Sequence, residues 1–172
     1  RPLLAWFAHD ADCEWLVAHR ATGGMTCGVR AGHLVLSLGG AEHELGTVAD
    51  LPLTVDGRAG YNVANLAAAA LAAAAMGVAP DVVAAVFARF GARPEDNLGR
   101  MMRFEANGVH ILVDYAHNPE GLGGLLQVAR GLLGDGGRLG MLLGHAGNRE
   151  DRDIERLAVT AAAFAPALVV VK

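Results

Sequence analysis

The sequence has few cysteines and no long basic or apolar run, and each of these absences excludes a class of protein. The two cysteines, Cys13 and Cys27, lack metal-ligand spacing, so they predict free thiols in a reducing compartment, the cytoplasm. The net charge is −4 and no run of Lys or Arg occurs, so neither nucleic acid nor an anionic membrane is an expected partner. The Ala/Leu tract at 66–75 has ten residues, too few to span a bilayer.

Two further absences concern the ends of the chain and its phosphate-binding signals. The chain starts with Arg rather than Met, shows no signal peptide and finishes in ALVVVK, a strand-like sequence, so we expect it to be a fragment of a longer protein. No Gly-Lys-Ser/Thr occurs, so the P-loop lysine and its Mg²⁺ ligand are missing. What is present is 172 residues, 53% of them hydrophobic, which suits one domain or two small ones.

The first part of the chain mixes short strands with helices. MTCGVR and HLVLSL predict two strands joined by an Ala-Gly turn, and the Ala/Leu-rich segment predicts a helix that Gly77 ends. The elements predicted here are a buried strand at 2–8, a helix at 10–24, strands at 25–30 and 33–38, a strand with a connector within 41–55, and helices at 60–78 and 80–91.

A polar segment, ARPEDNLGR at 92–100, divides two styles of sequence, and we place a domain boundary there. After it, two strands around Ala-Asn-Gly have the pattern of a hairpin. Strands then alternate with helices, which predicts an α/β fold with a parallel sheet and right-handed crossovers. The later elements are helices at 119–133 and about 150–164 and strands at 138–144 and 167–171.

The stretch VDYAHNPEG, residues 113–121, gathers polar side chains between an apolar strand and a helix. Ligands of open α/β sheets bind beyond the carboxyl ends of strands, so Asp114 could accept from ribose hydroxyls or hold a magnesium-bound water. His117 could donate to a phosphate or stack on a base. Asn118 has the position of a helix N-cap, and Asp114 with Tyr115 could equally form a turn. The residues alone leave both interpretations open.

Two other places in the sequence are candidates for ligand contacts. Asn62 and Asn65 share one face at the start of a helix, where capping explains one asparagine but not both. Their amides suit the edge of an adenine. Arg100, in NLGR, suits a phosphate or carboxylate, although a solvated linker arginine has the same pattern.

Five motifs in order carry a resemblance to a known family: ADLPLT, GYNVANLAAAA, NLGRM, VDYAHNPEGL and GNREDRDI. Together they resemble the Mur ligase family of ATP-dependent ligases, and most of all its cyanophycin synthetase branch. Two positions depart from the branch pattern. Leu98 stands where the family has Pro in NPGR, and Asn148 stands where it has the first Asp of GDRRDED.

The resemblance implies that residues 1–96 are the later part of the family's central nucleotide-binding domain and that 97–172 begin its Rossmann-like C-terminal domain. It implies ATP and Mg²⁺ as cofactors, with the main metal ligands outside this chain. The implied site residues are Asn65 with Asn62 nearby at the adenine, Arg100 and Asp114 at the nucleotide with Asp114 at the ribose, His117 and Asn118 lining the same cleft, and Asn148 and Arg149 facing the incoming substrate. No catalytic residue or metal ligand is assigned.

The activity implied is phosphorylation of a carboxylate by ATP, followed by attack of an amine on the acyl phosphate. Closure of the C-terminal domain would exclude water. Because the P-loop is missing, we expect this chain alone to be inactive. Two alternatives stay open: a nucleotide-binding module without ligase activity, and an inactive scaffold with the ligase fold. The carboxylate and amine are not readable, although the branch suggests aspartate and arginine joined to a peptide, and the sequence leaves oligomer formation open.

Overall fold

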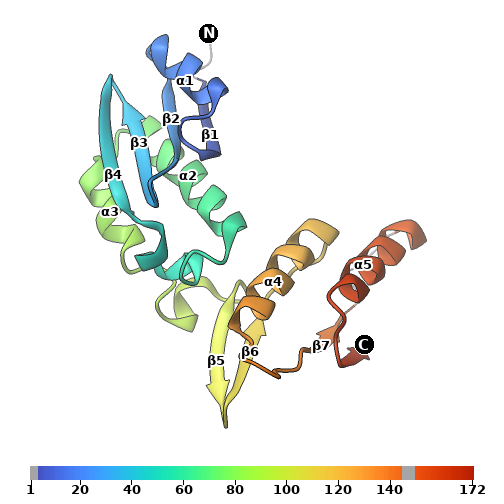
Figure 1. Ribbon diagram of the computed structural model, residues 1–172. Helices are drawn as coiled ribbons and strands as arrows, with labels where there is room; N and C mark the ends of the chain where they lie inside the picture. Colours follow the sequence, from blue (N-terminus) through green and yellow to red (C-terminus); the bar gives the residue numbers. More distant parts are fainter. Residues whose placement is uncertain (1–3, 145–149) are drawn as a thin grey trace. The chain divides into compact units, whose positions relative to one another are not determined.

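The computed structural model describes residues 4–144 and 150–172, and the chain divides into two compact units between Ala92 and Arg93 (Figure 1). The border falls within the polar segment 92–100. Among the described residues, no sheet contains strands from both units. That the first unit is the later part of a Mur ligase central domain stays a prediction.

The first unit contains a four-stranded sheet in the order β1-β2-β3-β4. β1 and β2 are parallel, with α1 between them in the chain, whereas β2–β3 and β3–β4 are antiparallel hairpins. The elements are β1 (Ala5–Asp10), α1 (Glu14–Ala21), β2 (Met25–Arg30), β3 (His33–Leu38) and β4 (Ala41–Thr47). The predicted strands MTCGVR and HLVLSL and the turn between them are confirmed.

Two helices, α2 (Gly60–Ala75) and α3 (Pro80–Phe87), cover this sheet. α2 packs against β1, β2 and β3, and α3 packs against β4. Nearly every position of α2 after Asn65 is Ala or Leu, and the buried residues recur at helical spacing along one stripe that faces the sheet. Its buried hydrophobic residues are Val63, Leu66, Ala67, Ala70 and Leu71. The stop at Gly77 is confirmed: Gly77 has φ 81°, and the next amide, Val78 N, bonds back to Ala73 O.

In the first unit, Arg30 forms an ion group with two carboxylates, and Cys27 is buried. Arg30 donates to the carboxylates of Asp12 and Glu42, and these hydrogen bonds hold the pKa of both carboxyls below the usual range. The ion group ties the end of β2 to the loop after β1 and to β4. Cys27 lies in the core, and burial raises the pKa of its thiol to about 12, so the thiol stays protonated.

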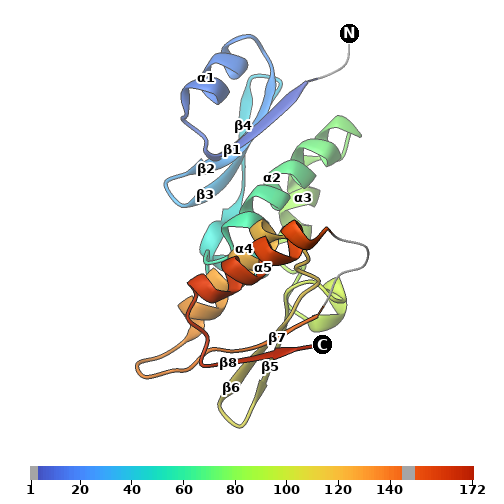
Figure 2. The ribbon, with the colours of Figure 1, turned by 90° about the vertical axis from the view of Figure 1, so that its right-hand side faces the viewer.

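The described residues of the second unit form two separate two-stranded sheets, two α-helices and a short 3₁₀ helix, Pro94–Asn97. β5 (Met102–Ala106) and β6 (Val109–Val113) form an antiparallel hairpin, and β7 (Gly140–Leu143) and β8 (Leu168–Val171) are parallel. The predicted hairpin is confirmed, with Asn107 and Gly108 both at positive φ in its turn. The helices α4 (Pro119–Leu132) and α5 (Asp151–Ala163) lie side by side (Figure 2). They enclose a small core of Leu122, Leu126, Leu139 and Ala161.

Several predictions about elements need correction. The first strand is not buried: Trp6 and Phe7 are 43% and 48% exposed, because β1 is an edge strand with a neighbour on one side only. α1 and α3 are shorter than predicted, and α3 ends at Phe87. β6 pairs with β5 in the predicted antiparallel hairpin, since a two-residue turn returns the chain directly, and among the described residues it has no partner in a parallel sheet. In the described part of this unit, parallel pairing occurs between β7 and β8.

Across residues 4–144 and 150–172, no helix combines the length and the hydropathy that crossing a membrane requires.

Gly28 in β2 provides a test of the packing in the first unit. A Cβ at this position would lie 2.8 Å from Ala11 Cα and 2.9 Å from Ala8 O, both backbone atoms that cannot rotate away. We expect Gly28→Ala to cost about 1–3 kcal/mol through overpacking and to lower the Tm by several degrees in circular dichroism melts. The control is Gly140→Ala, a strand glycine with open space around its Cβ position. Equal melting shifts for the two variants would contradict this packing.

Candidate functional site

The corner between β6 and α4 is built by a helix cap. Asn118 is the N-cap of α4, and its Oδ1 accepts a hydrogen bond of 2.7 Å from Gly121 N. Pro119 follows at the first helical position, where its missing N–H costs nothing. The capping interpretation of Asn118 is thereby confirmed. Its contact with a nucleotide stays a prediction.

Asp114 forms a turn and also reaches a second segment of backbone. Its Oδ1 accepts from Ala116 N at 2.7 Å, and its Oδ2 accepts from Met101 N, also at 2.7 Å. The turn-forming interpretation of Asp114 is therefore realised in the fold. A carboxylate has about four lone-pair positions, so two remain for a ligand.

Arg100, Tyr115 and His117 form a group that we call the Tyr115 stack. Arg100 Cζ lies 5.0 Å from the centroid of the Tyr115 ring, and the His117 ring centroid lies 4.8 Å from it at an interplanar angle of 48°. Tyr115 is 59% exposed. A guanidinium over an aromatic face is a cation–π contact, which leaves its N–H edge available to an anion. The structure thus brings together Arg100, Asp114, His117 and Asn118. Tyr115, at their centre, had no predicted ligand role.

Asn62 and Asn65 are in contact, but their surroundings differ. Asn62 is buried, and its Nδ2 donates to Leu53 O at 2.9 Å. Its Oδ1 accepts from Asn65 Nδ2 at 3.2 Å. The Asn62 amide therefore ties α2 to the 3₁₀ turn Pro52–Thr54, while Asn65 is exposed. This pair belongs to the first unit and the Tyr115 stack to the second.

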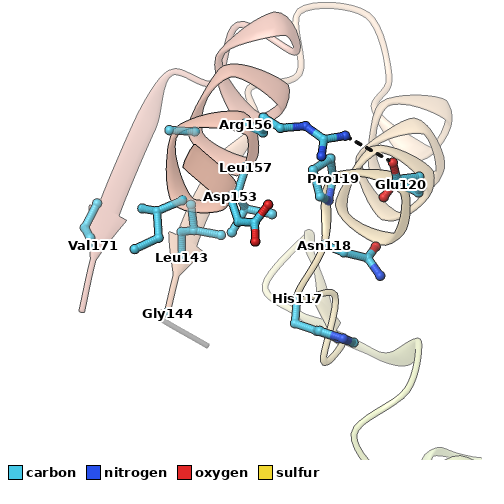
Figure 3. Close-up of a pocket in the computed structure, with 12 residues that line it drawn as sticks. His117, Asn118, Pro119, Glu120, Leu143, Gly144, Asp153, Arg156, Leu157 and Val171 are labelled. Atoms are coloured by element: carbon cyan, nitrogen blue, oxygen red, sulfur yellow. Dashed lines mark ion pairs between the residues drawn. The ribbon is translucent and has the colours of Figure 1, made fainter. Parts of the chain in front are cut away.

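A pocket of about 310 Å³ lies in the second unit beside the corner (Figure 3). It is lined by the first turn of α4, the first two turns of α5 and the carboxyl ends of β7 and β8. Its walls are mostly aliphatic: Pro119, Leu143, Ile154, Leu157, Ala158 and Val171. His117 and Asn118 also line the pocket, so it adjoins the Tyr115 stack.

The charged side chains of the pocket come from the two helices. Glu120 and Arg156 form an ion pair of 3.7 Å between α4 and α5. The Asp153 carboxylate points toward the space beside Pro119 (Figure 3). Neither Asp153 nor Arg156 is among the site residues that the sequence predicts. The available signal was the spacing of Asp153, Arg156 and Leu157, which puts them on one helix face.

Two predicted substrate residues, Asn148 and Arg149, lie outside the described residues. In the part of the chain that is described, no group of three or more His, Cys, Asp or Glu side chains could hold a metal ion.

Comparisons with known proteins give a family for the second unit and relatives for most of the chain. Residues 99–172 match the family model described as "Mur ligase, glutamate ligase domain". The chain is 33% identical over 159 residues to cyanophycin synthetases of Trichormus variabilis and of Nostoc sp., which covers 92% of this chain and 17% of each relative. It is 38% identical over 92 residues to a UDP-N-acetylmuramoyl-L-alanyl-D-glutamate–2,6-diaminopimelate ligase of Gloeobacter violaceus, covering 52% and 18% of the two chains. The chain spans about one sixth of the length of these relatives.

The two asparagines of α2 differ in a way that stability measurements can detect. Asn62→Ala removes a buried amide and leaves Leu53 O without its side-chain donor, at a cost of about 1–3 kcal/mol for an unsatisfied group. Asn65→Ala is the comparison. It removes the 3.2 Å bond to Asn62 Oδ1 but keeps the bond between Asn62 and Leu53, so we expect the smaller loss of one hydrogen bond, about 0.5–1.5 kcal/mol. Chemical denaturation of both variants measures the difference, and equal losses would refute the structural role of Asn62.

Proposed function

We propose that the whole chain is part of an ATP-dependent ligase that joins a carboxylate to an amine, and the match of residues 99–172 to the Mur ligase family model supports this proposal. The observation that carries this proposal is the corner after β6. It holds an arginine, a histidine and a carboxylate around an exposed tyrosine, beside a pocket of the size of a small molecule. The similarity to cyanophycin synthetases over 92% of the chain supports extending the proposal to the first unit.

In this proposal the Tyr115 stack contacts the nucleotide. The Arg100 guanidinium has free edges for phosphate oxygens, and the two remaining lone-pair positions of Asp114 suit ribose hydroxyls. His117 has a ring for stacking and nitrogens for hydrogen bonds. Asn65, exposed on α2, would contact the adenine, and Asn62 would support it from the core rather than touch the ligand.

The pocket is the proposed place for the incoming substrate. Its aliphatic walls suit the stem of an amino-acid side chain, and Asp153 with the Glu120–Arg156 pair offers charges to its polar ends. A substrate held there would lie next to the nucleotide corner, because His117 and Asn118 line the pocket too. Holding two reactants close together converts a bimolecular step into an effectively unimolecular one.

ATP fits the donors and acceptors of the corner, whereas the magnesium ion does not fit the described residues in the same way. A Mg²⁺ site uses one or two carboxylates plus phosphate oxygens. Among the described residues, the Asp114 carboxylate already holds two backbone amides, and Glu120 pairs with Arg156. No step is therefore assigned to the ion. We also propose that the reaction is cytoplasmic, since Cys13 and Cys27 are both free.

Because the P-loop sequence is missing, we expect that this chain alone neither hydrolyses ATP nor forms amide bonds. Phosphate release from magnesium-ATP, with amino acids and peptides as candidate substrates, should equal the blank without protein. The physical reason is that no lysine of a Gly-Lys-Ser/Thr motif is present to neutralise the β- and γ-phosphates. A magnesium-dependent rate on the order of 1 per second would show that the chain has its own catalytic centre.

Nucleotide binding by the corner is testable separately from turnover. Arg100→Ala removes a charged donor, and loss of a charge-assisted hydrogen bond corresponds to a roughly 10- to 150-fold drop in ATP affinity. Stability should change little, because Arg100 is exposed. Arg103→Ala, at an exposed arginine of β5, is the control. NMR titration of the chain with ATP measures both variants. If Arg103→Ala weakens binding as much as Arg100→Ala, general charge and not the Tyr115 stack attracts the nucleotide.

A further inference from the structure

The Asp114 carboxylate joins two segments of the second unit that are separate in sequence. One oxygen holds Ala116 N within the corner, and the other holds Met101 N at the entry to β5, each at 2.7 Å. Both partners of the cation–π pair are sequence neighbours of residues in these contacts. Arg100 directly precedes Met101, and Tyr115 directly follows Asp114.

Met101 has an unusual backbone for a residue with a side chain. Its φ is 46°, in the left-handed region that residues other than Gly, Asn and Asp seldom adopt. The residue is buried, and its N–H points at the Asp114 carboxylate. A charged acceptor forms a stronger hydrogen bond than a neutral one, so it can stabilise a conformation that the chain would otherwise leave. With Met101 held, the backbone beside Arg100 is fixed.

We propose that Asp114 is a positioning residue for Arg100: through the N–H groups of Met101 and Ala116 it holds the Arg100 guanidinium on the Tyr115 ring. The guanidinium then lies over the ring and keeps N–H groups available to an anion. The anion would be a nucleotide phosphate, a part of the inference that rests on the proposed function. The positioning itself does not depend on any ligand.

The first test uses the 172-residue chain without nucleotide. In Asp114→Asn, the amide keeps one acceptor oxygen where the carboxylate has two, so at least one of the two N–H bonds is lost. We expect amide hydrogen exchange at Met101 or Ala116 to become about 10- to 150-fold faster. The NMR shifts of the Arg100 side chain, displaced by the ring current of Tyr115, should move toward those of a free arginine. The control is Asp135→Asn, an exposed acid in the turn before β7.

A second variant tests whether the Asp114 bonds hold the cation–π pair or the cation–π pair holds the backbone. Tyr115→Leu removes the ring and leaves both Asp114 bonds possible, so the Arg100 shifts should become ordinary while exchange at Met101 and Ala116 stays slow. If exchange accelerates in Tyr115→Leu as much as in Asp114→Asn, the stack holds the backbone and the proposal is wrong. Unchanged Arg100 shifts in Asp114→Asn would also overturn it. Thermal melts of each variant confirm that the comparison is made on folded protein.

The last test connects the positioning role to nucleotide binding. ATP titrations of Asp114→Asn, Arg100→Ala and the double variant form a double-mutant cycle. If Asp114 also acts through Arg100, the loss of affinity in the double variant should be smaller than the sum of the two single losses, because part of the Asp114→Asn loss is already contained in Arg100→Ala. Fully additive losses would mean that Asp114 affects the nucleotide without Arg100, which overturns the positioning role. The absence of any ATP-induced shift in the unsubstituted chain would count against the proposed function alone, because the exchange and shift measurements need no ligand.

Discussion

The two backbone hydrogen bonds of the Asp114 carboxylate determine the arrangement of the corner. A carboxylate is the acceptor best able to serve two N–H groups at once, and each bond is stronger because the acceptor is charged. One bond shapes the turn after β6, and the other fixes the left-handed Met101 before β5. Arg100, Tyr115 and His117 are carried by these two segments, so their mutual distances depend on this one side chain.

Polar residues of the corner serve the fold and the proposed ligand together. Asn118 caps α4, and Asp114 forms the turn that follows β6. Both side chains also lie beyond the carboxyl end of a strand, where α/β folds bind their ligands. A structural role and a binding role therefore do not exclude each other. A side chain that is already held by backbone amides keeps one orientation, which reduces the entropy lost when it meets a ligand. On α2 the two roles are divided, with Asn62 buried as a support and Asn65 exposed.

The pocket of the second unit lies beside this corner. It lies where α4 and α5 begin, and the Glu120–Arg156 pair links these two helices at its rim. The residues that line it come from four elements spread between His117 and Val171. Because His117 lines the pocket as well as contacting Tyr115, the pocket and the Tyr115 stack adjoin, as the proposed function requires. The family of residues 99–172 makes a ligase the chemistry to propose for that arrangement.

The sequence by itself determined the elements that depend on local signals: the hairpin at Asn107-Gly108, the end of α2 at Gly77, the cap at Asn118 and the family motifs. It did not determine strand partners, since VHILV is apolar enough for a parallel sheet but pairs with β5 after a two-residue turn. Nor did it separate Asn62 from Asn65, because burial depends on which face of α2 meets the Pro52–Thr54 turn. Only the tertiary structure decided that Asp114 reaches Met101 and that Asp153 and Arg156 join a pocket. These contacts connect residues distant in sequence, and local propensity contains no information about them.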